Sequence, residues 1–117
     1  MEKMSFEWLV QRLESIPCDE RRKQYRGYFE FVLSGGRLPQ LYPILEEYFG
    51  VPFKPAGVKP TREVENCARS YGGILKQQTL YFCKHKEWSN CAMIWPWSDG
   101  SRATVKVAQG VIGEGKN

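Results

Sequence analysis

The chain has 117 residues, which suits one domain with an ordinary hydrophobic core and leaves no room for two. A hydrophobic share of 42% and a charged share of 26% exclude intrinsic disorder, and no apolar run approaches the roughly 20 residues of a membrane span. The net charge of +4 lies in the second half, because residues 1–50 hold seven Lys or Arg against eight Asp or Glu, whereas residues 51–117 hold ten against five. We therefore expect one basic, soluble domain that does not bind a membrane. The uneven distribution of charge is a modest indication of an anionic binding partner.

The N-terminus and the cysteines predict a cytoplasmic protein. Residues 1–9 include Glu2, Lys3 and Glu7 and lack the apolar core of a secretory signal. The four cysteines lie at positions 18, 67, 83 and 91 without a CxxC pair, a distribution typical of reduced thiols in a cytoplasmic chain.

Apolar residues recur at helical spacing near the start of the chain. The first predicted helix covers residues 6–16, with Ser5 as its N-cap and Pro17 as its end. The second covers residues 19–33, with Asp19 as its N-cap. Its apolar positions follow the i, i+3, i+4, i+7, i+8 pattern and are Tyr25, Tyr28, Phe29, Val32 and Leu33.

Glycines and a proline set the limits of the next elements. Gly27 lies inside the second predicted helix, where it indicates close packing by a neighbouring element, and Gly35 with Gly36 ends that helix. A third helix is expected from Tyr42 to Gly50, because Pro43 is acceptable only in a first turn.

The second half of the chain changes from a helical to an alternating pattern. Residues 51–60 hold three prolines and predict a stiff, ordered connector. A fourth helix begins after Thr61 and stops at Gly72 and Gly73. Three strands follow, over residues 80–84, 91–97 and 103–108.

These elements predict an α+β fold in which three to four N-terminal helices pack on a C-terminal three-stranded antiparallel sheet, a β-meander. The single domain, 1–117, is then divided into four parts: helical 5–50, a Pro-rich connector 51–60, a helix plus β-meander 61–109 and a frayed tail 110–117.

The Asp99-Gly100 pair predicts a two-residue hairpin turn and with it a strand register. In that register three pairs face each other on one side of the hairpin: Trp97 with Arg102, Trp95 with Thr104, and Met93 with Lys106. Rings interleaved with cations can stack on bases and neutralise phosphates, and they are also typical of protein-binding hot spots. The alternative is structural, because tryptophans on a sheet also form core and Arg or Lys stems can cover them.

The preceding hairpin decides whether Tyr81 joins that face. If Cys83 pairs with Cys91, Tyr81 lies beside Met93 and Trp95. A shift of one residue instead places Leu80 and Phe82 there and turns this region into hydrophobic core. The sequence leaves both registers open.

Two further groups of residues are candidates for chemistry. A secondary basic patch, expected in the first turns of the second helix, consists of Arg21, Arg22, Lys23 and Arg26. The weak candidates for zinc are Cys67, Cys83, His85 and Cys91, whose spacing departs from that of structural zinc sites. Cys83 with His85 is the candidate thiol–imidazole pair.

The chain holds no GxGxxG, P-loop, HExxH or GxSxG motif, so no cofactor is predicted and an enzyme is not the favoured reading. We expect a non-enzymatic binding module that binds another protein through Trp95, Trp97, Arg102, Lys106, Met93 and Tyr81. Single-stranded or structured nucleic acid on the same face is the alternative, and a zinc protein or thiol enzyme is the second alternative. The sequence carries no signal for the oligomeric state.

Overall fold

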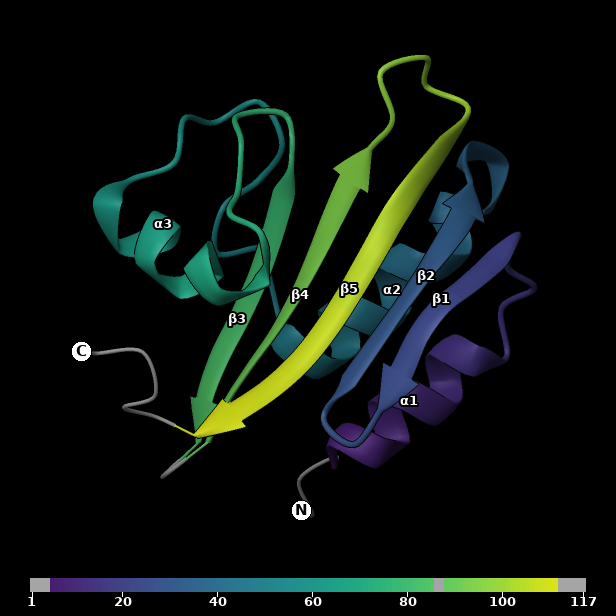
Figure 1. Cartoon of the computed structure of the whole chain (residues 1–117), viewed down its shortest axis with the longest axis horizontal. Coiled ribbons are helices and arrows are strands. Elements are labelled where there is room, and N and C mark those ends of the chain that lie inside the picture. Colours follow the sequence, from purple (N-terminus) through teal and green to yellow (C-terminus); the bar gives the residue numbers. More distant parts are fainter. Residues whose placement is uncertain (1–4, 86–87, 112–117) are drawn as a thin grey trace.

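A five-stranded antiparallel sheet forms the centre of the protein in a computed structural model that describes residues 5–85 and 88–111 (Figure 1). The strands follow the order β1-β2-β5-β4-β3 across the sheet. Their bounds are β1 Glu20–Tyr25, β2 Tyr28–Ser34, β3 Thr79–His85, β4 Trp88–Pro96 and β5 Arg102–Val111. The predicted three-stranded sheet is therefore wrong, because a second hairpin from the N-terminal half completes it.

The hairpin β1–β2 replaces the helix predicted over residues 19–33. Arg26 and Gly27 form its two-residue turn between the paired residues Tyr25 and Tyr28, and Gly27 has φ of 82°. Strand β2 is buried on both faces, so it reads as a continuous apolar run rather than an alternating one. Such a run also matches the helical spacing, which explains the wrong prediction.

The predicted first helix is confirmed as α1, Phe6–Glu14, and Ser5 caps it by accepting a hydrogen bond from the backbone N–H of Trp8. Helix α2, Leu38–Phe49, follows a short 3₁₀ helix, η1 Gly35–Arg37, and begins earlier than predicted. Proline at its N-terminus suits this start, and Pro43 lies within the helix.

Helix α3, Arg62–Ala68, begins after Thr61, whose side chain accepts a hydrogen bond from the N–H of Val64, as predicted. A second 3₁₀ helix, η2 Arg69–Tyr71, continues it to Gly72, which adopts the left-handed conformation. Over the described ranges, no helix is long and apolar enough to cross a membrane. The frayed tail was predicted for 110–117; residues 110 and 111 belong to β5, and the rest lie outside the described residues.

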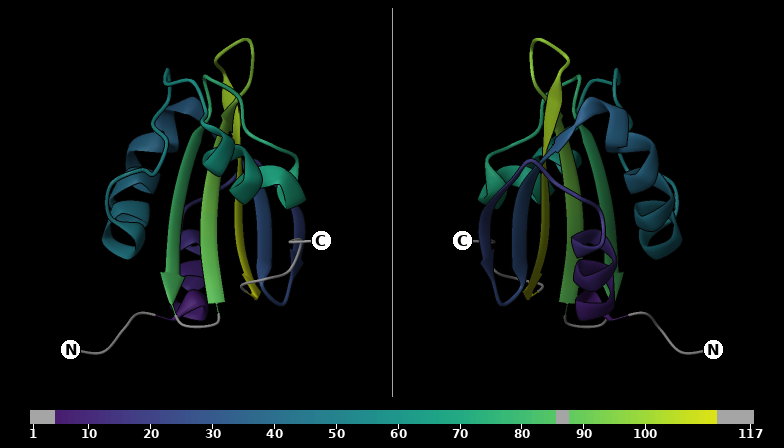
Figure 2. Two further views of the ribbon diagram at one scale, coloured as in Figure 1. Left: turned by 90° about the vertical axis from the view of Figure 1, so that its left-hand side faces the viewer. Right: turned by 90° about the vertical axis from the view of Figure 1, so that its right-hand side faces the viewer.

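The two faces of the sheet are covered unequally. Helices α1 and α2 pack on one face, against alternate side chains of the three inner strands, β2, β5 and β4. The short helix α3 packs on the opposite face, over β3 and β4, and encloses a second core (Figures 1 and 2). The Cα radius of gyration of 13.5 Å is that of one compact α+β domain of this length.

The predicted register of the last hairpin is confirmed. Met93 lies opposite Lys106, Trp95 lies opposite Thr104, and the N–H of Trp97 donates to the carbonyl of Arg102 at 2.9 Å. The turn itself differs from the predicted two-residue loop, because residues 98–101 lie between Trp97 and Arg102 and the N–H of Gly100 donates to the carbonyl of Trp97 at 2.9 Å.

The open question about β3 is settled by the pairing of Phe82 with Cys91. Leu80 and Phe82 lie on the same face as Met93, in the core beneath α3. Tyr81 points to the other face and is buried in the core against α1 and α2, so its predicted place beside Trp95 is wrong.

The Pro-rich connector is fixed to the sheet by Lys54. The backbone of Lys54 pairs with that of Leu80, at the outer edge of β3. Its side chain is only 2% exposed, and the ammonium donates to the carbonyls of Pro55, Lys76 and Gln78. Three carbonyls thus take the place of the water that this buried cation has lost, and burial lowers its pKa.

Replacing Gly27 by alanine is expected to lower the free energy of unfolding by about 1–2 kcal/mol, since a Cβ is strained at positive φ and would lie 3.3 Å from the carbonyl oxygen of Gln109. The matched control is Gly36→Ala, because a Cβ added at Gly36 would meet no other atom within 4 Å. There we expect the free energy of unfolding to change by less than about 1 kcal/mol. Urea unfolding at neutral pH measures both. If residues 19–33 were a helix, Gly27→Ala would instead stabilise the protein by about 1 kcal/mol, and that sign would contradict the hairpin.

Candidate functional site

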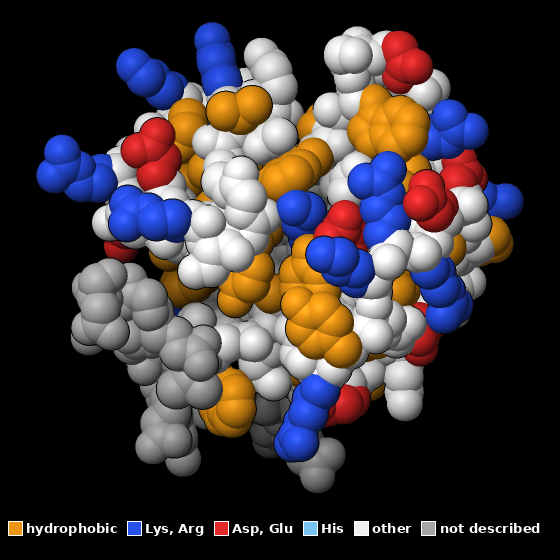
Figure 3. Space-filling model, in the orientation of Figure 1, with side chains coloured by type: hydrophobic (Ala, Val, Ile, Leu, Met, Phe, Trp, Pro, Cys, Tyr) orange, Lys and Arg blue, Asp and Glu red, His pale blue; other side chains and the backbone are white. Residues whose placement is uncertain are grey.

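The part of the sheet that α3 leaves uncovered carries aromatic rings between charged side chains, on the right-hand half of the view in Figure 3. We call this surface the open half-face. Its residues come from β1, β2, β4 and β5 and from the turns next to them: Asp19, Glu20, Arg22, Lys23, Tyr25, Tyr28, Glu30, Trp95, Trp97, Arg102 and Lys106.

Two guanidinium groups lie near the ring of Trp97 at one end of the open half-face. The Cζ atoms of Arg102 and Arg22 lie 5.6 Å and 6.0 Å from its ring centroid. Its indole N–H donates to the hydroxyl of Thr104 at 3.0 Å. The ring is half-buried, and these contacts fix its orientation.

Trp95 supports the segment that follows α3. The ammonium of Lys106 lies 3.5 Å from its ring centroid and donates to the carbonyl of Tyr71 at 3.0 Å. Gly72 lies so close that a Cβ there would come within 2.6 Å of the indole. Trp95 is therefore half-buried under η2, and the structural alternative considered for the tryptophans applies to this ring.

Lys106 has a lowered pKa because burial disfavours its charged form. Glu30 acts in the opposite direction and raises it, whereas the positive charges of Lys23 and Arg22 lower it. The cations of β1 and β5 therefore lie close enough to repel one another.

Three tyrosines form a stack that the sequence did not reveal. The ring of Tyr28 lies 5.2 Å from that of Tyr25 and 6.4 Å from that of Tyr71, with interplanar angles of 21° and 19°. The hydroxyl of Tyr28 donates to Glu30 at 2.7 Å, and burial together with this hydrogen bond raises the pKa of Tyr28. Tyr25 is 64% exposed at the end of the stack. A two-residue turn at Arg26-Gly27 is the signal that would have placed Tyr25 and Tyr28 side by side.

The predicted basic patch is divided by a β-bulge. Arg21 pairs with Phe31 and Lys23 with Glu30, so that Arg22 is the extra residue. Arg22 and Lys23 consequently both belong to the open half-face, next to Lys106.

Arg21 lies on the other face of the sheet. Its guanidinium is 5.9 Å from the ring of Phe29 and 3.6 Å from the carboxylate of Glu14. Arg26 lies in the turn. The patch expected at a helix N-terminus is therefore wrong, and half of it merges with the Trp/Arg/Lys face predicted on the last hairpin.

Two other predicted site residues do not reach this surface. Met93 is fully buried in the core beneath α3, and Tyr81 is buried on the opposite side, with its ring 5.8 Å from that of Phe49. Four of the six residues predicted for the binding face therefore lie on it, namely Trp95, Trp97, Arg102 and Lys106.

The candidate metal ligands are not brought together in the described ranges, where no group of three His, Cys, Asp or Glu side chains could hold a metal ion. Cys67 and Cys91 belong to the core beneath α3, whereas Cys83 alternates with Phe82 and points to the other face. The side chain of His85 lies outside the described residues.

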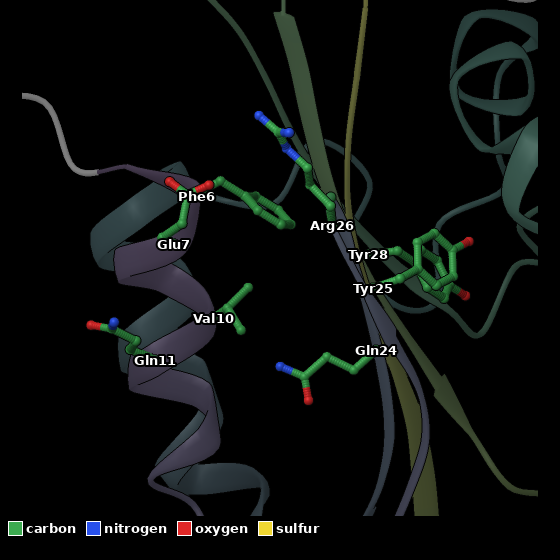
Figure 4. Close-up of a pocket in the computed structure, with 9 residues that line it drawn as sticks. Phe6, Glu7, Val10, Gln11, Gln24, Tyr25, Arg26 and Tyr28 are labelled. Atoms are coloured by element: carbon green, nitrogen blue, oxygen red, sulfur yellow. The ribbon is translucent and has the colours of Figure 1, made fainter.

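A groove of about 280 Å³ lies between α1 and the hairpin β1–β2 (Figure 4). Phe6 and Val10 point into it from α1, and Gln24 points toward them from β1. Arg26 lies at one end. We call it the edge groove, because β1 is the outermost strand on this side of the sheet.

Comparisons with protein-family models, with curated proteins and with solved structures found no match. A function can therefore be argued only from the residues and geometry described above.

Alkaline pH should destabilise the protein partly through Cys91, whose pKa burial raises from 9.0 to about 12. Above pH 9 the unfolded chain loses this proton while the folded chain keeps it, so the free energy of unfolding falls with rising pH, by up to about 1.4 kcal/mol per pH unit for one such group. Cys91→Ala should flatten this decline between pH 9 and 11 in urea titrations. At pH 7 neither the Cys91 thiol nor the alanine that replaces it is charged. The difference in the free energy of unfolding between the two proteins at that pH therefore measures only lost packing. Equal slopes for the two proteins would contradict the prediction.

Proposed function

We propose that this protein is a non-enzymatic binding module that binds another protein through the open half-face. The observation that carries the proposal is the combination of ordered aromatic rings with mostly neutralised cations on an uncovered part of a central sheet. Aromatic and arginine side chains are enriched where protein interfaces have their binding energy.

The charge pairing favours a protein over nucleic acid. Arg102 contacts Asp19 at 2.6 Å, Arg22 lies 3.6 Å from Glu20, and Lys106 donates to a backbone carbonyl. Phosphates bind where the net charge is positive, and here the carboxylates of Asp19 and Glu20 lie beside two of the four cations and lower the positive charge of the surface. A protein surface with both signs of charge can instead add to these pairs.

The rings are arranged before a partner arrives. Trp97 is fixed by a hydrogen bond and two guanidinium contacts, and Tyr25 is stacked on Tyr28 while most of its surface remains exposed. A ring that is already ordered loses little conformational entropy on binding. Tyr25 and Trp97 are thus the anchors we expect a partner to cover.

A cytoplasmic location and the absence of a cofactor remain predictions from the sequence. Zinc binding or thiol catalysis has less support, because Cys83 and Cys91 point to opposite faces of the sheet. Nucleic-acid binding remains the alternative, and the experiment below separates it from protein binding.

Replacing Tyr25 by a photo-crosslinking phenylalanine analogue should yield a discrete protein adduct in the native host. Tyr42 is the matched control, because it is also an exposed tyrosine, at 40%, but lies on α2 on the other side of the sheet. We expect an adduct from position 25 and none from position 42. Lys23→Glu, an exposed change on the open half-face, should remove most of the adduct.

A parallel titration with labelled single-stranded oligonucleotide tests the alternative. We expect no binding at physiological salt. Tight binding that falls steeply with salt and is lost in Lys23→Glu would overturn the protein assignment in favour of nucleic acid.

A further inference from the structure

The outer edge of β1 is open, in contrast with the outer edge of β3. In the described sheet β1 pairs only with β2, and all six of its side chains are exposed. The edge of β3 is partly closed, because Lys54 pairs with Leu80 there. An unpaired edge presents backbone N–H and C=O groups that another strand can bind.

The bulge limits the part of β1 that can accept a strand. At Arg22 the ladder is irregular, so regular pairing is confined to Lys23–Tyr25. Tyr25 and Tyr28 flank the two-residue turn and form the hydrogen-bonded pair of such a hairpin. The alternation of an antiparallel ladder then directs the backbone N–H and C=O of Gln24 outward, into the open edge.

The edge groove lies beside this stretch. Phe6 and Val10 of α1 provide an apolar floor, and Gln24 forms the opposite wall (Figure 4). A strand added to β1 would direct alternate side chains into this groove and toward the open half-face. The 280 Å³ volume suits one or two small apolar side chains.

Charge indicates what the added strand contains. Lys23 and Arg26 are exposed, and no described carboxylate lies within salt-bridge distance of either. Lys23 shares the face of β1 that carries Tyr25, whereas Arg26 lies at the end of the edge groove, so acidic side chains on the added strand would meet one uncommitted cation on each face of β1.

A second copy of the chain would offer this edge no carboxylate. Antiparallel pairing of the regular stretch with itself about Gln24 would set Lys23 of one copy opposite Tyr25 of the other, and each cation would keep its charge without an acidic partner. The observations therefore favour a different segment with the opposite charge.

We propose that an extended segment with alternating acidic and apolar residues, supplied by the partner protein, adds to the edge of β1 at Lys23–Tyr25 and places an apolar side chain in the edge groove. This inference rests on the proposed function, because its occupant is a segment of a protein partner. It specifies how that partner is held: backbone hydrogen bonds from Gln24 provide attachment, and Lys23, Arg26, Phe6 and Val10 select the side chains.

The test uses a fluorescent octapeptide of alternating glutamate and valine, with a lysine–valine octapeptide as the control of opposite charge. We expect fluorescence anisotropy to detect binding of the acidic peptide only. Lys23→Glu together with Arg26→Glu should weaken that binding at least tenfold. Both side chains are exposed, so the fold should survive, and circular dichroism verifies this.

A pair of substitutions at Gln24 separates strand addition from simple charge attraction. Gln24→Pro removes the outward N–H without interrupting the ladder to β2, whereas Gln24→Ala keeps that N–H. Both lose the side-chain hydrogen bond from Gln24 to Glu14. We expect Gln24→Ala, which loses one wall of the edge groove, to weaken peptide binding only partly, and Gln24→Pro, which also loses the outward N–H, to abolish it. Equal binding by the two variants, or no binding of the acidic peptide by the unaltered protein at millimolar concentration, would overturn the proposal.

The same variants distinguish this failure from failure of the proposed function. If Gln24→Pro leaves the photo-crosslinked adduct at position 25 intact while Lys23→Glu removes it, the open half-face binds the partner and the edge of β1 does not. If position 25 yields no protein adduct, the proposed function itself fails.

Discussion

The pairing of β2 with β5 is the interaction on which the rest of the structure depends. It joins residues near 30 to residues near 105 through seven consecutive pairs, from Tyr28 with Ala108 to Ser34 with Arg102. Both strands are central and covered on both faces by buried side chains, so each of the two cores contains residues from both strands. A contact over this sequence separation costs loop-closure entropy, which the burial of two apolar faces at once offsets. Without it the N-terminal hairpin and the C-terminal meander would each lack a partner for their apolar sides.

The same pairing creates the open half-face. It places the bulged strand β1 and the tyrosines beside the tryptophans of the last hairpin, although these segments lie at opposite ends of the chain. Helix α3 has only seven residues and reaches β3 and β4, and η2 extends the cover to Trp95, so among the described residues no α-helix lies over the neighbouring part of the face. Rings at such a position would be exposed to water, and cations lie over two of them, Trp95 and Trp97. Their charges are in turn balanced by Asp19, Glu20 and nearby backbone, which leaves a surface that is ordered but still partly uncovered.

Local signals predicted what depends on local geometry. The Asp99-Gly100 turn was sufficient for the register of β4 and β5, and Ser5 and Thr61 were sufficient for the starts of α1 and α3. The helix expected over residues 19–33 was wrong because a strand buried on both faces has no alternation, and the competing signal was a short Arg26-Gly27 turn. The basic patch and the Trp/Arg/Lys face were predicted as two separate surfaces. They are neighbours only because β2 pairs with β5, and no local signal predicts that pairing. The two registers for β3 stayed open because the sequence between Cys83 and Cys91 carries no turn signal comparable to Asp99-Gly100.

The two edges of the sheet show how the fold deals with unpaired backbone. At β3 a buried lysine closes part of the edge: the backbone of Lys54 pairs with Leu80, and its ammonium donates to three carbonyls that an apolar side chain would leave without these donors. At β1 the chain instead relies on a bulge and on three consecutive cations, both of which discourage association with a second identical edge. These devices act against like-charged strands and against long, regular pairing. They leave a short regular stretch, Lys23–Tyr25, next to an exposed ring and a groove that Glu7 lines together with Phe6 and Val10. Geometry and charge thus limit strand pairing at the edge of β1, whereas a second segment of the same chain limits it at the edge of β3.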